Sequence, residues 1–322
     1  MISITINILT FAVGLALLVY GSNLLIHACV RISSLFNLTP LFIGTIFVAF
    51  GTSMPEFGVS VIAALRNQDA IALGNVVGSN IANIGLVLGL CGFLMPLSVD
   101  KTIFKKELPI MLASTVLLYW FSLDCIISRA ESFILIVCFI AFCFISYRGA
   151  KGQKAAAGEL EGFKLKKILA KTDRKSTVAV LSIISLLLVI FGANLMVRSG
   201  VFLARTFGVS SWLIAMTVFA VGTSLPELAA SLTASLKKVP SISVGNIVGS
   251  NIFNILLIIG IAGLIRPIRI YNPTIFLFEF PVLLVFSVFL FIFMRLRYRI
   301  SRVEGLFLLL GYMVFLVVLI IK

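Results

Sequence analysis

Residues 49–60 read AFGTSMPEFGVS and residues 220–231 read AVGTSLPELAAS, so the chain carries one short polar pattern twice. Each copy lies in an otherwise apolar stretch, and each holds a proline followed by a glutamate. A charged side chain at the centre of a bilayer costs about 2.5–3.5 kcal/mol even on the gentler scales. Neither copy contains a Lys or Arg that would pair with its glutamate. The pattern therefore indicates a polar site inside a membrane protein.

The similarity between the two copies extends well beyond these motifs. A shift of 171 residues also aligns ALGNVVGSNIANIGLVLG (72–89) with SVGNIVGSNIFNILLIIG (243–260), and 22 of the 44 residues from 49 to 92 are identical to their counterparts. We predict five membrane spans in each copy. Because five is odd, the second copy enters the membrane from the opposite side. In secondary transporters with such inverted repeats, the substrate site lies near the midplane, on helices that are broken there.

The composition predicts an all-α polytopic membrane protein. Only 12% of the 322 residues are charged, against about 25% in soluble domains, and apolar runs of about the 20 residues needed to cross a bilayer recur along the chain. These runs are too long and too uniformly apolar for barrel strands. The first run lacks a basic leading region and a cleavage site, so we expect it to be retained. We predict ten transmembrane helices, at about 4–27, 38–65, 70–95, 104–121, 126–147, 177–200, 209–236, 241–265, 274–294 and 302–321.

The spans divide into two inverted-topology five-helix repeats, residues 1–147 and 177–322, joined by a basic linker at 148–176. The formal charge of +14 does not indicate a nucleic-acid partner, because cytoplasmic loops of membrane proteins are enriched in Lys and Arg. Placing both termini outside puts 19 of the 26 Lys and Arg residues in inner loops. Nine of them lie in the linker, which we expect to meet the anionic inner leaflet.

The first motif predicts a cluster of oxygen atoms. Pro55 has no N–H, so the carbonyl of Gly51 loses its helical partner. Thr52 and Ser53 lie four and three residues before Glu56, which places all three on one face of the helix. The second motif repeats this arrangement with Gly222, Thr223, Ser224, Pro226 and Glu227.

The second pair of aligned blocks adds amide and hydroxyl oxygens. Asn75, Ser79 and Asn83 follow one another at four-residue steps, and Asn246, Ser250 and Asn254 match them. Together with two glutamates they make an all-oxygen set, which suits hard cations such as Ca²⁺, whereas softer metals favour Cys or His. The five cysteines form no C-x-x-C pair, and the single histidine, His27, has no partner motif. For Asn75, Asn80, Asn246 and Asn251 taken singly, packing between helices is the expected role.

The duplicated patterns G-T-S-x-P-E and G-x-x-x-G-S-N-I-x-N resemble the α-repeats of the calcium/cation antiporter superfamily, in its prokaryotic sodium/calcium exchanger-like form. The resemblance implies a central diamond of Glu56, Asn83, Glu227 and Asn254. It also implies surrounding hydroxyls from Thr52, Ser53, Ser79, Thr223, Ser224 and Ser250, and backbone carbonyls from Ala49 and Ala220. In some members one of the positions held here by Asn83 and Asn254 is an aspartate, so this cage has two formal negative charges rather than three.

The resulting hypothesis is Na⁺/Ca²⁺ antiport by alternating access through a midplane site in a prokaryotic inner membrane. Ca²⁺ and Na⁺ are the expected substrates, while the number of Na⁺ ions, any use of K⁺ and the oligomeric state stay open. We expect no cofactor and no enzymatic activity, since no G-x-x-x-x-G-K-[ST] motif occurs. Two alternatives also stay open: a Ca²⁺/H⁺ exchanger with the glutamates as proton carriers, and a cation channel lined by the same oxygens.

Overall fold

The computed structural model describes residues 2–99, 101, 103–150, 174–206, 220–270 and 275–321. The first half is mostly helical, with π-helical segments (η) set into longer helices. Its helices are α1 (Ile2–Phe36), α2 (Pro40–Phe42), η1 (Ile43–Val48), α3 (Ala49–Thr52), α4 (Met54–Leu65), α5 (Asp69–Ala82), η2 (Asn83–Leu88), α6 (Gly89–Leu94), η3 (Ile103–Glu107), α7 (Leu108–Phe121) and α8 (Arg129–Ala150).

The second half repeats this series. Its helices are α11 (Lys175–Thr206), α13 (Ala220–Thr223), α14 (Leu225–Leu236), α15 (Pro240–Phe253), η5 (Asn254–Ile259), α16 (Gly260–Ile265), η6 (Ile275–Glu279), α17 (Phe280–Arg297) and α18 (Arg302–Ile321). From α3 to α6 every described boundary recurs 171 residues later, at α13 to α16. The predicted linker lies mostly in 151–173, and the start of the predicted seventh span lies in 207–219, both outside the described residues.

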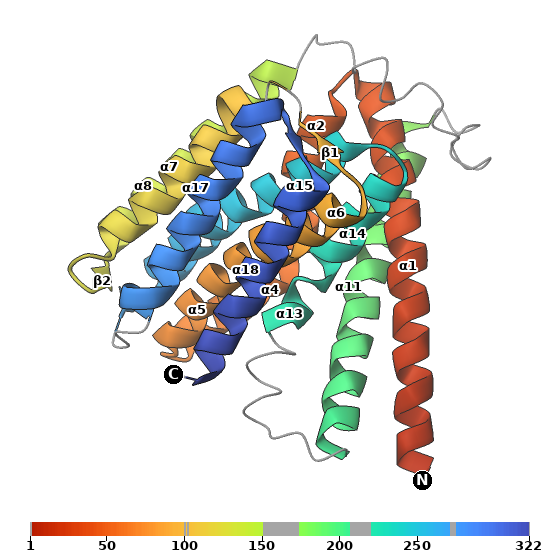
Figure 1. The fold of residues 1–322 in the computed structure, drawn as a ribbon, viewed down its shortest axis with the longest axis horizontal. Coiled ribbons are helices and arrows are strands. Elements are labelled where there is room, and N and C mark those ends of the chain that lie inside the picture. Colours follow the sequence, from red (N-terminus) through yellow and green to blue (C-terminus); the bar gives the residue numbers. More distant parts are fainter. Residues whose placement is uncertain are drawn as a thin grey trace.

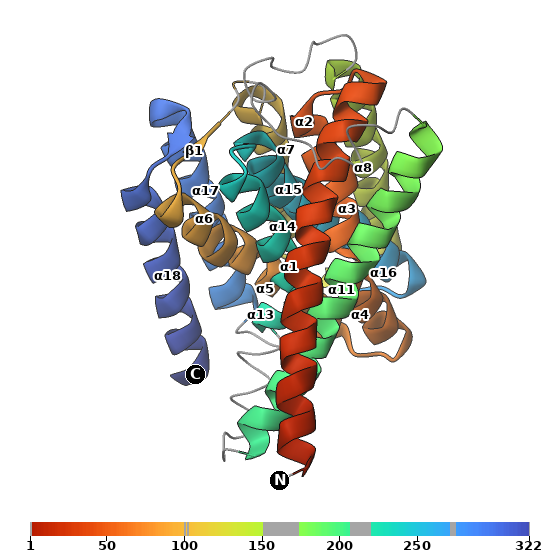
Figure 2. The same ribbon diagram turned by 90° about the vertical axis from the view of Figure 1, so that its right-hand side faces the viewer.

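Ten helical segments of the described chain match the ten predicted spans. Seven helices are long and apolar enough to cross a membrane, and Pro40–Leu65 adds a broken span that bends by 47°. The helical segments 103–121 and 220–236 complete the set. In Figures 1 and 2 the N-terminal end of α1 and the C-terminal end of α18 both point toward the same end of the bundle, as an even number of spans requires. The fold is therefore the predicted all-α bundle of two inverted repeats.

The first span is longer than its apolar run indicated. We predicted 4–27, but α1 continues to Phe36. No Gly or Pro interrupts residues 28–36, so the helix ends only at Asn37, whose positive φ of 49° begins the turn before α2. Asn is one of the few residues that adopt this left-handed conformation readily.

Two short antiparallel sheets connect the two repeats. The strand β1 (Leu97–Ser98) pairs with β4 (Arg299–Ile300), and β2 (Ile126–Ile127) pairs with β3 (Ile268–Arg269). Each sheet joins one strand of each repeat, and β3 stands in the second repeat where β1 stands in the first. Exchanging the repeats therefore converts one sheet into the other, which is the behaviour of a two-fold pseudo-symmetric molecule.

The long helices α1 and α11 lie side by side along one flank of the bundle (Figures 1 and 2). A Cβ on Gly14 would lie 2.9 Å from the carbonyl oxygen of Gly192, and one on Gly21 would lie 3.1 Å from that of Ser185. The repeat shift relates Gly14 to Ser185 and Gly21 to Gly192, so the two close approaches are one contact made twice. Glycine is needed because backbone meets backbone here.

The centre of the bundle is formed by α5–η2–α6 and α15–η5–α16, which are largely buried on all sides. The crossing of η1 over α15 is close because glycines occupy both sides. A Cβ on Gly44 would lie 2.7 Å from the carbonyl oxygen of Ile242, and one on Gly245 would lie 2.9 Å from that of Leu41. These crossings hold the polar blocks of both repeats in the interior.

Candidate functional site

Both glutamate motifs interrupt their helices at the serine. The helix α3 ends at Thr52, Ser53 has a ψ of 7°, and α4 starts at Met54 with Pro55 in its first turn. Pro55 has no N–H for the Gly51 carbonyl, and the Ser53 N–H points toward that carbonyl instead. The second motif repeats the break at Ser224, whose ψ is 3°.

Each break places a glutamate in the first turn of the helix that follows. Glu56 is the third residue of α4 and Glu227 the third residue of α14, and both side chains are fully buried. A carboxylate is favoured at a helix N-terminus, where the unpaired N–H groups carry partial positive charge. The break therefore helps to hold the charge that the surrounding lipid disfavours.

The amide blocks contain a second local irregularity. The π-helical segments η2 and η5 begin at Asn83 and Asn254. Such segments are uncommon and occur frequently at functional sites. Both asparagines are fully buried, and they follow Ser79 and Ser250 on the same helix faces.

Hydrogen bonds join the motifs of one repeat to those of the other. Ser53 Oγ donates to Glu227 Oε1 at 3.0 Å, and Thr52 Oγ1 donates to Asn246 Oδ1 at 3.2 Å. From the second block, Ser79 Oγ lies 3.5 Å from Glu56 Oε1 and 3.4 Å from the Thr223 hydroxyl. The structure thus brings the predicted residues of both repeats into one buried cluster.

Six buried side-chain oxygens in this cluster have no hydrogen-bond partner among the described residues. They are Glu56 Oε2, Glu227 Oε2, Asn83 Oδ1, Asn254 Oδ1, Ser224 Oγ and Ser250 Oγ. Leaving a buried polar group unsatisfied costs about 1–3 kcal/mol. The carboxylate and amide oxygens form two repeat-related pairs, and they occupy the four positions of the predicted diamond. A bound hard cation would satisfy such acceptors.

The buried cluster contains two carboxylates, those of Glu56 and Glu227. Within the described ranges, no group of three or more His, Cys, Asp or Glu side chains could hold a metal ion. The cluster is therefore built from oxygens of amides, hydroxyls and two acids, a donor set that suits Ca²⁺ or Na⁺ rather than a softer metal.

Asn75 and Asn246 have the packing role expected for them. The Asn75 amide nitrogen donates to the Glu56 carbonyl at 3.1 Å and to Ser60 Oγ at 2.9 Å. Asn246 makes the repeat-related bonds to the Glu227 carbonyl at 3.4 Å and to Ser231 Oγ at 2.9 Å. Each asparagine ties the glutamate-bearing helix to the helix beside it.

The two predicted backbone ligands lie at the start of the helices that precede the breaks. The Ala49 carbonyl already accepts a hydrogen bond from the Ser53 N–H at 3.0 Å, and Thr52 Oγ1 lies 3.4 Å from it. Ala220 is the first residue of α13. The role of both carbonyls in an ion path stays a prediction.

A cavity of about 550 Å³ leads to the cluster from one side. It lies between α4 and α11, and it reaches Thr223 and Pro226 at its inner end and Gln68 in the turn before α5. Val59, Ile62 and Ala193 are among the residues that line it. Thr223 of the cluster and Gln68 both line this cavity, so it extends from the cluster toward the turn before α5.

The repeat-related position between α1 and α14 is closed. Ser22 Oγ and Thr233 Oγ1 lie 2.9 Å apart, and Ile26 packs with Ala230 and Ala234 in a buried apolar cluster. A shift of 171 residues relates Ser22 to Ala193, which lines the cavity. It also relates Thr233, Ala230 and Ala234 of α14 to residues of α4 that line the cavity. The two repeats are thus alike in sequence, but α4 and α14 differ in how they pack against α11 and α1.

The model of the sodium/calcium exchanger protein family matches residues 6–148 and 177–321, which is most of the chain. The chain belongs to the sodium/calcium exchanger family. The sodium/calcium exchanger MaX1 of Methanosarcina acetivorans is 33% identical over 98% of this chain and 99% of its own length. The inner membrane protein YrbG of Escherichia coli K12 is 34% identical over 91% of this chain and 89% of its own.

Solved structures of the sodium-calcium exchanger NCX_Mj are similar along the whole chain. The form soaked with zero Na⁺ and Ca²⁺ gives a TM-score of 0.83 at 29% identity and covers 98% of both chains. The form soaked with 2.5 mM Na⁺ and 0.1 mM Ca²⁺ gives 0.81 at 29% identity, over 96% of this chain and 97% of that one. Members of the sodium/calcium exchanger family are transporters, so this chain is a membrane ion transporter and not an enzyme.

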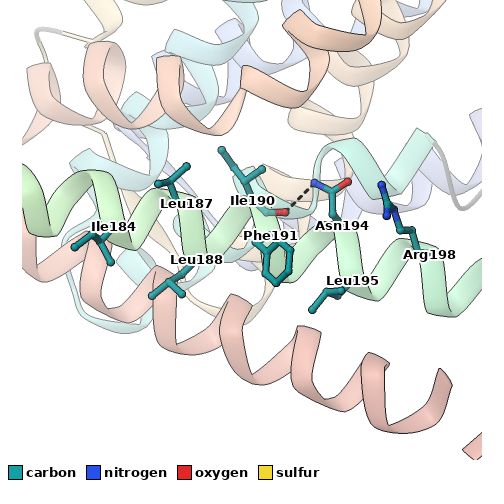
Figure 3. A pocket seen from close by; sticks show the side chains of 8 residues that line it. All are labelled: Ile184, Leu187, Leu188, Ile190, Phe191, Asn194, Leu195 and Arg198. Carbon is teal, nitrogen blue, oxygen red and sulfur yellow. Dashed lines mark hydrogen bonds between the residues drawn. The ribbon is translucent and has the colours of Figure 1, made fainter. Parts of the chain in front are cut away.

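A separate hollow of about 600 Å³ runs along the outer face of α11 (Figure 3). Apolar side chains such as Leu187 and Phe191 line most of it, and Arg198 stands at one end. The amide of Asn194 donates to the Ile190 carbonyl at 3.0 Å. This hollow is not part of the buried cluster, and its apolar lining is typical of a surface that faces lipid.

Proposed function

We propose that this exchanger carries Na⁺ and Ca²⁺ in opposite directions through the cluster around Glu56 and Glu227. The observation that carries the proposal is the set of six unpartnered buried oxygens. It includes both carboxylates and both diamond amides, Asn83 and Asn254. Thr52, Ser53, Thr223 and Ser79 complete the site through the hydrogen bonds that orient these groups. No cofactor takes part, and the two ions are the substrates.

Charge supports exchange rather than one-way passage. Two ionised carboxylates carry about −2, which one Ca²⁺ or two Na⁺ would balance. Both loads use the same oxygens, so binding of one displaces the other. At distances of a few ångströms an uncompensated unit charge is worth several kcal/mol in a poorly solvated site. The protein therefore changes conformation less readily with an empty site than with Na⁺ or Ca²⁺ bound. This difference couples the Na⁺ flux to the Ca²⁺ flux.

The difference between the two halves supports alternating access. The site is open to the cavity between α4 and α11 and closed where α1 packs on α14. Because the repeats are related by two-fold pseudo-symmetry, exchanging their conformations would close the first route and open the second. The helices α1 and α11 pack against each other through backbone contacts at Gly14 and Gly192, so they are suited to move as one unit.

We propose that the protein lies in the inner membrane of a prokaryotic cell, with both termini on the outer side of that membrane. Gln68 follows two spans and therefore lies on the same side as the N-terminus, so the open cavity faces outward. The basic residues then lie inside, as the distribution of Lys and Arg requires. Sodium entering through this route would drive Ca²⁺ out of the cell.

The test is ⁴⁵Ca²⁺ uptake into proteoliposomes preloaded with Na⁺. We expect uptake to require the Na⁺ gradient and to vanish in Glu56→Gln, which removes one charge without changing shape. Glu131→Gln is the matched control, since Glu131 caps α8 at the Ser128 N–H and is not part of the cluster, and Gln retains an acceptor oxygen. Uptake that follows a pH gradient without Na⁺ would replace this proposal with Ca²⁺/H⁺ exchange. Calcium current without any counter-ion would replace it with a channel.

A further inference from the structure

Two asparagines outside the predicted diamond contact its amides across the interface between the repeats. Asn83 Nδ2 donates to Asn251 Oδ1 at 3.1 Å, and Asn254 Nδ2 donates to Asn80 Oδ1 at 2.9 Å. The shift of 171 converts one bond into the other. All four side chains are buried, with at most 1% of their surface exposed, so water does not compete for these bonds.

These bonds determine which end of each diamond amide faces the cluster. With its nitrogen engaged by Asn251, the Asn83 amide directs its oxygen away from that contact, and this oxygen is one of the unpartnered six. The same holds for Asn254 and Asn80. A rotation of either amide by 180° would set two carbonyl oxygens against each other and present an NH₂ group, which cannot bind a cation.

The outer asparagines are themselves held in the orientation that this requires. Asn80 Nδ2 donates to the Asn251 backbone carbonyl at 3.3 Å, and Asn251 Nδ2 approaches the sulfur of Met111 at 3.7 Å. Their nitrogens are thereby occupied, and their oxygens are the atoms left to meet Asn254 and Asn83. The chain of contacts runs from a helix backbone, through one amide, to the oxygen at the ion site.

We propose that Asn80 and Asn251 are positioning residues that fix the oxygens of Asn254 and Asn83 toward the transported ion. The inference rests on the proposed function and deepens it, because it assigns the selection of Ca²⁺ to these amides. Ca²⁺ takes about 6–8 oxygens, so losing one preset amide oxygen weakens its site directly. Outer partners of metal ligands typically contribute about 10–100-fold in affinity.

The test compares Asn251→Leu with Asn251→Asp by Na⁺-driven ⁴⁵Ca²⁺ uptake. Leucine has the same branched shape and number of heavy atoms but no acceptor for Asn83, so we expect its apparent KM for Ca²⁺ to rise about 10–100-fold with the maximal rate largely retained. Aspartate keeps an acceptor oxygen and is expected to bind Ca²⁺ at least as tightly as the wild type. Ser243→Ala is the control on α15, since the Ser243 hydroxyl accepts a hydrogen bond from Ser235 Oγ at 3.0 Å, a residue outside the ion cluster, and its KM should not change.

A double-mutant cycle separates positioning from a general loss of structure. In an Asn83→Ala background the oxygen that Asn251 orients is gone, so adding Asn251→Leu should raise the KM no further. Independent, multiplying effects would overturn the inference, as would an Asp variant that fails like Leu. These outcomes differ from failure of the proposed function, in which the wild type itself shows no Na⁺-driven uptake.

Discussion

The closed contact between α1 and α14 leads to a prediction about the resting conformation. The Ser22 and Thr233 hydroxyls are hydrogen-bonded at 2.9 Å, and Ser22 Oγ also lies within hydrogen-bonding distance of the Val19 carbonyl, at 3.1 Å. The repeat-related residues are Ala193 and Ile62, which have no hydroxyl. The conformation seen here therefore has a hydrogen bond that the exchanged conformation of the proposed mechanism could not form.

Replacing Thr233 by Val removes the hydroxyl, and with it the hydrogen bond to Ser22, without changing the shape of the side chain. Ser22 keeps its bond to Val19, so no buried hydroxyl proton is left without an acceptor. The loss should then equal the net value of one hydrogen bond, about 0.5–1.5 kcal/mol. At room temperature this corresponds to an increase of about 2- to 13-fold in the population of the exchanged conformation. Installing the contact on the other side, with Ile62→Thr and Ala193→Ser together, should shift the population in the same direction.

The assay measures how often the α1–α14 contact opens. Ala230 is only 1% exposed, whereas its repeat counterpart Val59, which lines the cavity, is 40% exposed. A cysteine at Ala230, in a background without the five native cysteines, should react with a water-soluble maleimide only in the exchanged conformation. Purified protein in lipid nanodiscs exposes both faces to the reagent. When opening is fast relative to labelling, the rate reports the population directly.

We expect Thr233→Val to raise the labelling rate about 2- to 13-fold and Thr233→Ser, which keeps the hydroxyl, to leave it near the wild-type value. Equal rates for Val and Ser would refute the argument, because the contact would then contribute nothing to the equilibrium. A lower rate for Val would mean that the hydroxyl favours the exchanged conformation.

Two further predictions follow from charge and from packing. The substitution Asn254→Asp adds a third carboxylate, whose charge a third Na⁺ would balance. The Hill coefficient for Na⁺ should then rise from about 2 toward about 3, and transport should become sensitive to a clamped membrane potential. Unchanged Na⁺ dependence would contradict the charge count. In Gly192→Ala the new Cβ would meet the Leu18 nitrogen at 2.6 Å and the Gly14 carbonyl oxygen at 2.7 Å, so thermal unfolding should show a loss of about 1–3 kcal/mol. Gly200→Ala on the same helix meets only Phe11, at 3.9 Å, and should unfold like the wild type.

Much of this architecture could be predicted because the local sequence motifs that determine it occur twice. A proline in a membrane helix removes one hydrogen bond wherever it stands, so Pro55 and Pro226 indicated the breaks that the structure shows at Ser53 and Ser224. The four-residue steps of the amide blocks likewise predicted which side chains share a face. The diamond positions came from a family resemblance, and all four side chains are fully buried in the structure.

The features that could not be predicted depend on contacts between distant segments. Asn80 and Asn251 lie inside the duplicated block, yet only the packing of α5 against α15 shows that they contact the diamond amides. The sheet pairs β1–β4 and β2–β3 consist of two-residue strands with no sequence signal of their own. The length of α1 was underestimated because hydropathy marks the apolar core of a span and not the end of its helix.

The sequence could not predict which of the two proposed conformations is the more stable. The identity shared by the repeats predicts that two such states exist, since either repeat could adopt either shape. Which one prevails depends on the positions where the copies differ. The pair Ser22 and Thr233 differs from Ala193 and Ile62 by a single hydrogen bond, a difference of about 1 kcal/mol that hydropathy and motif spacing do not register. An alternating transporter requires this near-balance, because a contact worth several times more would hold the protein in one state and stop exchange.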